Sequence, residues 1–278
     1  MPNQDFCFVR CGAMPYFCLM NKWCVILSLA LVTVQGIGQI RLDKLEIKTR
    51  QTYSLEGSNV LVVDTLIMRD SSCIMLHKEK SESIINAKIL VANSGAKILG
   101  YGVDGKAGKV GSDGFRQGAP CRVGGNASGG AVGGSGSSGR NLSLYVNQLV
   151  ITGSLTITLN GGNGGMGGNG GRGGDGGGGT RVCGGGNGGN GGNGGNGGNG
   201  GNGGNLDMRC IQCQNLHIIQ GHQLIINTCG GFAGLGANGG SGGLAGLGPN
   251  QDGKNGTRGL PGTNGVTGKQ GAIRFEKE

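Results

Sequence analysis

The chain is poor in residues that usually build a globular fold. Aromatic residues make up 4 % of its 278 residues and charged residues 14 %, and there are only 5 prolines. The low proline content excludes a collagen triple helix, which combines glycine at every third position with abundant proline. No segment has the apolar spacing of an amphipathic helix, so an all-helical fold is excluded as well.

Positive charge is present but is not concentrated. The chain carries 24 Lys and Arg against 15 Asp and Glu, a net charge of +9. Nucleic-acid-binding surfaces usually gather basic residues in clusters with aromatic residues between them, and no such cluster occurs here. We therefore expect no nucleic-acid partner.

The motifs of enzymes and cofactor-binding proteins are also missing. None of the 3 histidines stands in a pattern with a nucleophile and a carboxylate, and no phosphate-binding lysine follows the glycines. The glycine tracts do not match the calcium-binding nonapeptide repeat. The sequence therefore predicts a protein that is not an enzyme and that has no cofactor or metal.

The N-terminal region has the layout of an export signal. Residues 20–39 place one lysine before an apolar stretch and two glycines after it. The stretch is too short to span a membrane as a helix, and small residues mark a cleavage site. We expect residues 1–38 to be a signal peptide, with Met20 as an alternative start and an uncleaved anchor as the alternative reading. The mature protein is then secreted, extracellular or at the cell surface, without a membrane span.

Glycine is in large excess, at 68 residues, and it follows strand-like segments. Three segments share one design, in which a strand with alternating apolar residues, a short turn and a second strand end on glycine: Ala87–Gly100, Val150–Gly161 and His217–Gly230. The alternation predicts strands with one buried face. Short strands recurring in this way predict a β-solenoid or a sandwich-like framework.

Each segment is followed by a glycine tract of period three, made of two arms with a short break between them. The first arm of the first tract has Gly-X-Y triplets from Gly102 to Gly114, and the last arm of the third tract has the same type from Gly253 to Gly271. Both arms of the middle tract consist of Gly-Gly-X triplets. A Gly-Gly-X arm leaves two faces without side chains, so we expect the middle hairpin at the centre and the Gly-X-Y arms at the edges.

A period of three is the repeat of the polyproline-II helix, which has no internal hydrogen bonds. Its backbone groups need partners on neighbouring helices, and only glycine allows so close an approach. Three hairpins then give a six-arm polyglycine-II helix bundle. The alternative is that the tracts are flexible linkers, which glycine-rich segments with few aromatic residues usually form.

The predicted fold class is therefore all-β combined with polyproline-II helices. The expected order is a signal peptide at 1–38, a strand framework at 39–100, glycine hairpin 1 at 101–140, strand block 2 at 141–160, glycine hairpin 2 at 161–205, strand block 3 at 206–229, glycine hairpin 3 at 230–271 and a C-terminal strand at 272–278.

Six of the 10 cysteines follow the expected signal peptide. An even number of cysteines in an exported protein suggests disulfides. Cys121 and Cys183 stand at the breaks of the first two hairpins, so we predict a disulfide between adjacent hairpin tips. A CxxC pair is also a zinc or redox motif, but no second CxxC accompanies it. The pairing of the other candidates stays open; they are Cys73, Cys210, Cys213 and Cys229.

Two regular rows of side chains lie on the predicted arms. The apolar stripe follows the outgoing arm of the third hairpin, at Phe232, Leu235, Leu244 and Leu247. Such a stripe packs on the strand framework or contacts another subunit. The polar array follows the returning arm of the second hairpin, at Asn187, Asn190, Asn193, Asn196, Asn199, Asn202 and Asn205. We expect this array to be solvated or to cross-link neighbours, and a platform for glycan or ice is the alternative.

The two terminal strand-like segments, Ile40–Lys48 and Ala272–Glu278, give a second route to assembly. Such strands can add to the sheet edge of a neighbouring copy, and uncapped ends let copies stack head to tail. The alternative is that both strands pair only within the chain. The apolar residues of these assembly strands are Ile40, Leu42, Leu45, Ile47, Ile273 and Phe275.

The glycine tracts resemble the polyglycine-II bundles of the snow-flea antifreeze protein and of phage tail-fibre adhesin tips, over about residues 100–272. The overall plan, with a signal, strand blocks, Gly-Gly-Asn tracts and the terminal GTRGLPGTNGVTGKQG, is similar to secreted collagen-like proteins of bacteria, Bacteroidota especially. The resemblance rests on repeat type, and it implies a glycine-helix bundle more than a particular role.

These observations predict a secreted structural protein that associates with itself. The expected assembly is an extracellular fibre or surface layer, formed by end-to-end stacking or terminal-strand addition. The alternative is an extracellular adhesin, or a module that binds ice or a cell-surface glycan through the asparagine or apolar face of the bundle.

Overall fold

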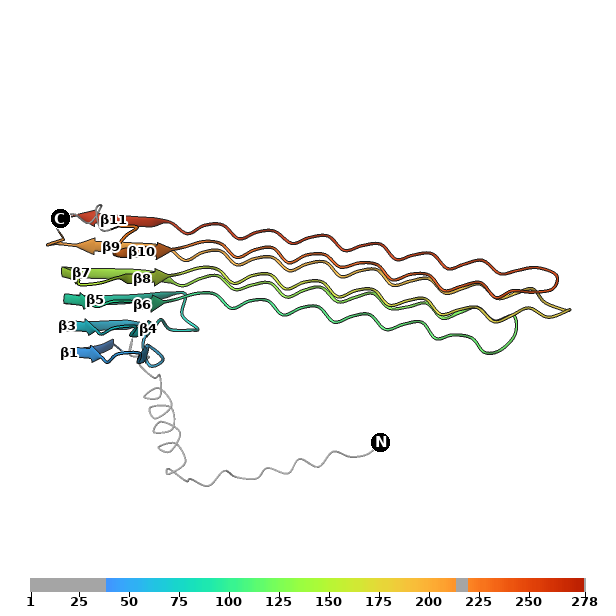
Figure 1. The fold of residues 1–278 in the computed structure, drawn as a ribbon, viewed down its shortest axis with the longest axis horizontal. Coiled ribbons are helices and arrows are strands. Elements are labelled where there is room, and N and C mark those ends of the chain that lie inside the picture. The colour runs from blue at the N-terminus through green and yellow to red at the C-terminus, as the bar shows by residue number, and fades with distance from the viewer. Residues whose placement is uncertain (1–38, 214–219, 278) are drawn as a thin grey trace, which may run out of the picture. The chain divides into compact units, whose positions relative to one another are not determined.

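The computed structural model describes residues 39–213 and 220–277. The described residues belong to one compact unit, Gln39–Glu278, which is all-β and without α-helix in the described part (Figure 1). The expected signal at 1–38 lies outside the described residues, as does most of the strand expected to begin at residue 217.

Six parallel strands form the larger sheet, and each neighbouring pair is in register over most of its length. In spatial order they are β1 (Gln39–Ile47), β3 (Val60–Met68), β5 (Glu82–Ala92), β7 (Asn141–Ile151), β9 (Leu206–Cys210) and β11 (Ile273–Lys277).

Five shorter parallel strands form the second sheet, which does not close with the first into a barrel. In spatial order they are β10 (Leu224–Asn227), β8 (Leu155–Thr158), β6 (Ala96–Leu99), β4 (Cys73–Met75) and β2 (Thr52–Ser54). The chain alternates between the sheets, so each odd-numbered strand and the even-numbered strand after it make one rung. The strands of each strand–turn–strand segment therefore lie in different sheets.

The hydrophobic core lies between the two sheets. Alternation in β3 buries Leu61 and Val63, while Val62 between them is only partly buried. In the facing sheet, Ile98 of β6 and Ile157 of β8 are fully buried and belong to the same cluster. Because side chains alternate across a strand, one apolar face from each sheet is enough to build this core.

The three glycine hairpins all leave the five-stranded sheet and return to the six-stranded sheet. They follow β6, β8 and β10 and lead into β7, β9 and β11 (Figure 1). We number the arms in chain order: arm 1 (101–117), arm 2 (122–140), arm 3 (160–179), arm 4 (184–205), arm 5 (229–248) and arm 6 (253–272). Outgoing arms 1, 3 and 5 thus extend neighbouring strands of one sheet, and returning arms 2, 4 and 6 extend neighbouring strands of the other.

Backbone hydrogen bonds continue from the sheets into the arms. The Gly100 N–H donates to the Thr158 carbonyl at 2.8 Å, and two residues further on Gly102 donates to Asn160 at 2.7 Å. Bonds then recur at every third residue along both layers. Between the layers, Gly195 of arm 4 donates to Gly168 of arm 3 at 2.8 Å. The strands therefore set the neighbours of each arm.

The arm glycines are required by close approach rather than by backbone conformation. A Cβ at Gly195 would overlap the Ala131 carbonyl, and one at Gly168 would overlap the Lys109 carbonyl. Among the described glycines only Gly95 and Gly221 have positive φ, and both lie outside the arms. Glycine is present in the arms because a neighbouring backbone occupies the space of a side chain.

The hydrogen bonds also place the arms in order. Arms 3 and 4 each bond to four other arms, whereas arms 1 and 6 each bond to two. The prediction that the Gly-Gly-X hairpin is central and that the Gly-X-Y arms lie at the edges is confirmed.

Candidate functional site

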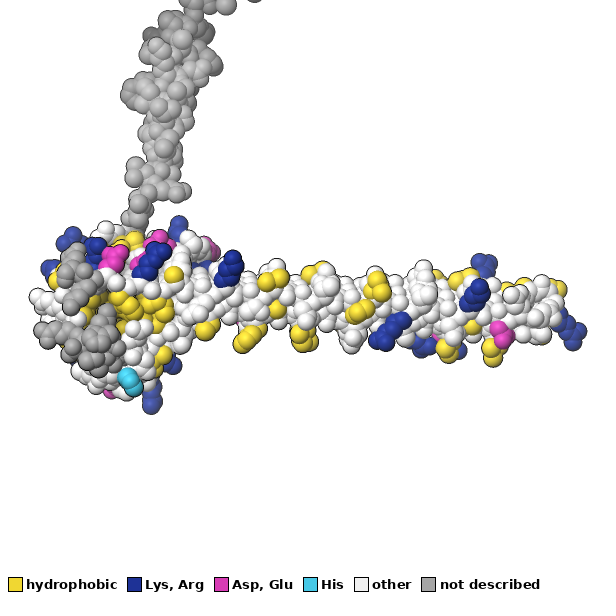
Figure 2. Space-filling model, turned by 90° about the horizontal axis from the view of Figure 1, so that it is seen from above, with side chains coloured by type: hydrophobic (Ala, Val, Ile, Leu, Met, Phe, Trp, Pro, Cys, Tyr) yellow, Lys and Arg dark blue, Asp and Glu magenta, His cyan; other side chains and the backbone are white. Residues whose placement is uncertain are grey.

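The outer surfaces of the arms present the regular rows that the sequence singles out. In a Gly-Gly-X triplet both glycines contact neighbouring arms, so the third side chain projects outward. Figure 2 shows hydrophobic side chains projecting from two opposite sides of the arm region. Arms 1, 3 and 5 carry one face, and arms 2, 4 and 6 carry the other.

The apolar stripe of arm 5 is exposed to solvent. Phe232 and Leu247 are each 75 % exposed, Leu235 is 55 % and Leu244 is 57 % exposed. The alternative that the stripe packs on the strand framework is therefore wrong, because the arm points away from the strands after its first residues. Contact with another subunit stays a prediction.

The polar array is exposed, yet its side chains already have partners. Each Asn Oδ1 of arm 4 accepts a backbone N–H of arm 6, from Lys254 to Asn187 at 2.8 Å through Ala272 to Asn205 at 2.8 Å. Arm 6 is an edge arm, so these N–H groups face no further arm. The array thus cross-links arms 4 and 6, one of the two roles expected for it, and its amide NH₂ groups have no hydrogen-bond acceptor among the described residues.

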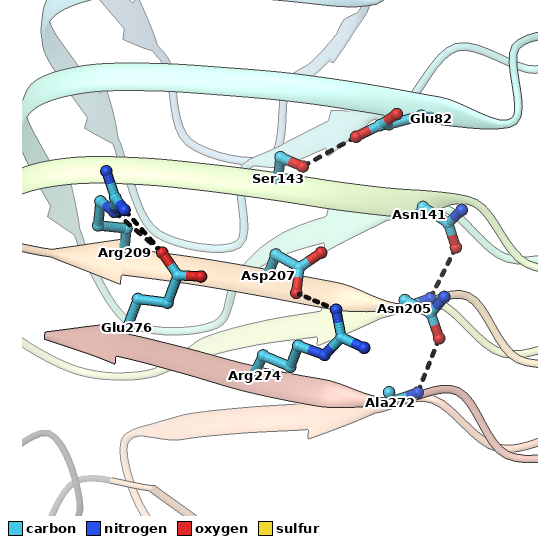
Figure 3. Close-up of polar contacts among 9 residues, drawn as sticks. All are labelled: Glu82, Asn141, Ser143, Asn205, Asp207, Arg209, Ala272, Arg274 and Glu276. Carbon is cyan, nitrogen blue, oxygen red and sulfur yellow. Dashed lines mark hydrogen bonds and ion pairs between the residues drawn. The ribbon is translucent and has the colours of Figure 1, made fainter.

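The same contact recurs elsewhere in the bundle. Figure 3 shows Asn141 accepting the Asn205 N–H, and Asn205 in turn accepting the Ala272 N–H, both at 2.8 Å. In the other layer, the Phe232 N–H donates to Asn163 at 2.9 Å. Sequence reasoning expected cross-linking only from the array of arm 4 and missed these further contacts, although their signal is an Asn or Asp at the outward position of an arm with another arm beside it.

Two disulfides are present among the described residues. Cys121 and Cys183 are bonded with their Cα atoms 6.0 Å apart, which confirms the predicted link between the tips of the first two hairpins. Cys210 is bonded to Cys213. No group of three or more His, Cys, Asp or Glu in the described part of the chain is placed to hold a metal ion.

Two of the disulfide candidates whose pairing the sequence leaves open, Cys73 and Cys229, are free in the structure. Cys73 begins β4 inside the framework, where burial raises the pKa of its thiol. Cys229 is exposed at the base of arm 5, three residues before Phe232 and on the same line as the stripe. Each therefore lies on a different part of the fold, and the two are not bonded to each other.

A small charged cluster lies toward the tip of the bundle. Asp175 of arm 3 forms ion pairs with Arg172 at 2.9 Å and Arg116 at 3.5 Å. Its Oδ1 also accepts the Leu244 N–H at 2.9 Å. That hydrogen bond, more than the two arginines, holds the pKa of the Asp175 carboxyl below its ordinary value. The cluster joins three outgoing arms of one layer.

The assembly strands lie at opposite edges of the six-stranded sheet. β1 pairs with β3 and β11 pairs with β9, and no described strand pairs with the outer edge of either. Ile47 is buried, whereas the rest are only partly covered: Ile40, Leu42, Leu45 and Ile273 border the core, and Phe275 is 37 % exposed. Internal pairing thus accounts for one edge of each strand.

Ion pairs link β11 to the strand beside it. The Arg209 guanidinium of β9 lies 2.9 Å from the Glu276 carboxylate of β11, and the Asp207 carboxylate of β9 lies 3.9 Å from the Arg274 guanidinium of β11 (Figure 3). Within the chain, the last strand is held by its ladder and by these contacts.

No helix in the described residues is long and apolar enough to cross a membrane. No family model matches the chain, and no curated protein is similar to it in sequence. One solved structure is weakly similar, the springtail antifreeze protein from Granisotoma rainieri, described as a bundle of nine polyproline type II helices. It is 22 % identical, the match covers 59 % of this chain and 93 % of that chain, and the TM-score of 0.13 is too low to support an argument about fold or function.

Proposed function

We propose that this chain is a secreted structural protein, a subunit that stacks end to end into an extracellular fibre or surface layer. The observation that carries the proposal is that β1 and β11 are the two edge strands of one parallel sheet. If β11 of one copy pairs with β1 of the next, the same contact repeats without closing, and a filament results.

The backbone of β11 is suited to this joint. The Ala272 carbonyl accepts the Leu206 N–H, so residue 272 faces β9. Backbone groups of alternate residues in a strand point to opposite sides, so Ile273 and Phe275 direct theirs to the open edge. The side chain of Phe275, partly exposed in one copy, would be covered by the next.

Within the subunit, we propose that the arms are polyglycine-II helices and that the strand rungs form a β-solenoid. Hydrogen bonds between arms at every third residue support this reading, as does the absence of positive φ among the arm glycines. Two disulfides are compatible with an extracellular location.

Electron microscopy of purified residues 39–278 tests the proposal. With six strands per subunit and about 4.8 Å between strands, filaments should have an axial repeat of about 29 Å. Monodisperse particles at high concentration would contradict it.

A proline substitution separates the joint from other contacts. Phe275→Pro removes the outward N–H and should prevent filaments without changing the melting of the subunit. Phe275→Ala is the matched control, because it shortens the same side chain but keeps the N–H. Filaments of unchanged repeat from Phe275→Pro would show that this edge is not the joint.

The second candidate is an ice- or glycan-binding module. The seven exposed asparagines of arm 4 favour it, since they present amide groups at a regular interval. Their engaged oxygens make it the weaker candidate. Growth of single ice crystals in the presence of the protein tests it; unshaped crystals at high protein concentration would remove the ice-binding form.

A further inference from the structure

We infer that the apolar stripe of arm 5 pairs two copies of this chain side by side, with their arms antiparallel. This inference deepens the proposed structural role by naming a lateral interface that is independent of the strand edges. It rests on the order of the side chains along arm 5, their exposure, and the position of the stripe relative to the strand framework.

The outward-pointing residues of arm 5 form a palindromic pattern of apolar and polar side chains, so the pattern is the same from either end of the arm. Two apolar residues are followed by two polar residues and then by two apolar residues: Phe232, Leu235, Asn238, Ser241, Leu244 and Leu247. A twofold axis between Asn238 and Ser241 therefore brings Phe232 opposite Leu247 and Leu235 opposite Leu244 of the second copy. An isologous contact requires this kind of self-complementary pattern.

The exposure of the stripe follows the same symmetry. The outer pair, Phe232 and Leu247, is 75 % exposed at both positions, and the inner pair, Leu235 and Leu244, is 55 % and 57 % exposed. Asn238 and Ser241 are exposed between them and would meet each other across the axis. The interface would thus have apolar contacts at both ends and a polar contact at its centre.

The centre of the stripe is also the centre of the arm. Arm 5 runs from the end of β10 to the break at residues 249–252, so its midpoint lies between Asn238 and Ser241. In the antiparallel pair, the tip of one bundle ends where the strand framework of the other begins. Figure 2 shows that the framework is broader than the arm region, so two frameworks side by side would hold parallel stripes apart.

The neighbouring arm adds no repulsion to this arrangement. Arm 3 lies beside arm 5 in register, with Asp175 next to Leu244 and Asn169 next to Asn238. The same twofold axis places Asp175 opposite Met166 and Arg172 opposite Asn169. Neither charged side chain of arm 3 therefore faces a like charge.

Cysteine cross-linking tests the direction of the pair. The background carries Phe275→Pro, which removes end-to-end joining, and Cys229→Ser, which removes the exposed thiol. Leu235→Cys and Leu244→Cys are introduced into separate chains, which are oxidised with copper phenanthroline alone and as a mixture. We expect covalent dimers in the mixture only. Dimers from each chain alone would show a parallel contact, and no dimer in any sample would show no contact; both results overturn the inference.

A matched pair of variants tests the apolar contact without new thiols. Leu235→Ser with Leu244→Ser removes two leucines from the stripe that are 55 % and 57 % exposed, while Leu260→Ser with Val266→Ser removes two apolar residues from arm 6 that are each 70 % exposed. We expect the dissociation constant, measured by analytical ultracentrifugation in the Phe275→Pro background, to rise about 100-fold for the first variant. Equal effects of both variants, or none, would contradict a specific stripe interface.

The outcomes separate this inference from the proposed fibre. Dimers on the Phe275→Pro background, together with no filaments from the unmodified chain, support the pair and refute end-to-end stacking. Filaments with the expected axial repeat, together with a monomeric Phe275→Pro variant, support stacking and refute the pair.

Discussion

The strand framework and the glycine arms are stabilised in different ways. In the framework, apolar side chains such as Leu90 and Ile157 are fully buried between two sheets. In the arms, the interior is made of glycine backbone, and every large apolar side chain is on the outside. The comparison shows that a chain with few large apolar residues can bury backbone instead, provided that the buried N–H and C=O groups find partners.

The two regions are not independent. Neighbouring strands β6, β8 and β10 continue into neighbouring arms 1, 3 and 5, and hydrogen bonds pass from one region to the other without a break. An isolated arm has no internal hydrogen bonds, so it gains stability only beside its neighbours. The framework fixes those neighbours and therefore lowers the entropic cost of assembling the arms.

The largest effect is expected from the framework core. Leu90→Ala leaves a cavity at a fully buried site of β5 and should lower the free energy of unfolding by about 2–5 kcal/mol. Because the arms depend on the strands, hydrogen exchange measured by mass spectrometry should rise in both regions. Faster exchange in the framework alone would show that the arms hold together by themselves.

A smaller and local effect is expected from the arm interior. Gly195→Val places a side chain against the Ala131 carbonyl and should destabilise the bundle by about 1–3 kcal/mol or more. Exchange should rise in the arms while the framework stays protected. Met166→Val is the control, since the Met166 side chain points outward from arm 3 and is 58 % exposed; an equal effect at both positions would contradict the role given to the glycines.

Each asparagine contact should contribute less to the free energy of unfolding than a buried leucine of the framework or a glycine of the arm interior. Asn193→Leu leaves the Leu260 N–H without its acceptor and should cost about 1 kcal/mol. Asn193→Asp retains an oxygen at that site and should be closer to the unmodified chain. Thermal melting of the two variants compares them, and identical losses would mean that the oxygen has no role.

The smallest effect concerns pH at the bundle tip. The pKa of Asp175 is lowered in the folded chain, chiefly by the Leu244 N–H and then by Arg172 and Arg116. Its contribution is therefore present above the unfolded-state pKa, and it is lost as the pH falls through the depressed folded-state pKa. The protection factors of amides near the tip, which are exchange rates corrected for their intrinsic pH dependence, should fall in acid, and Asp175→Asn should remove this dependence. An unchanged acid response in that variant would assign it to another group.

Much of the arm arrangement could be predicted from the sequence, because triplet type is a local property. A second glycine in each triplet marks an arm with neighbours on more sides, and cysteines at two breaks mark adjacent tips. The sequence also places the apolar stripe on one line. These features depend only on a period of three and on the absence of Cβ atoms.

Other features depend on long-range pairing and could not be predicted. The sequence does not show that two consecutive strands of the chain belong to different sheets, or that arms 1, 3 and 5 lie in the same layer. The short strand β2 (Thr52–Ser54) is too brief for a periodic signal. The role of Asn193 depends on arm 6 lying beside arm 4, and the separation of Cys73 from Cys229 depends on the rung to which each belongs.

Site-resolved amide exchange of residues 39–278 by nuclear magnetic resonance tests the central claim most directly. In arm 4 the Gly194 N–H donates to Leu260 and the Gly195 N–H to Gly168, each at 2.8 Å, whereas no described group accepts the Asn196 N–H. The account predicts two slowly exchanging glycines and one fast asparagine in successive triplets, with Asn190 and Asn205 protected by side-chain acceptors. Uniformly fast exchange along the arm would contradict it.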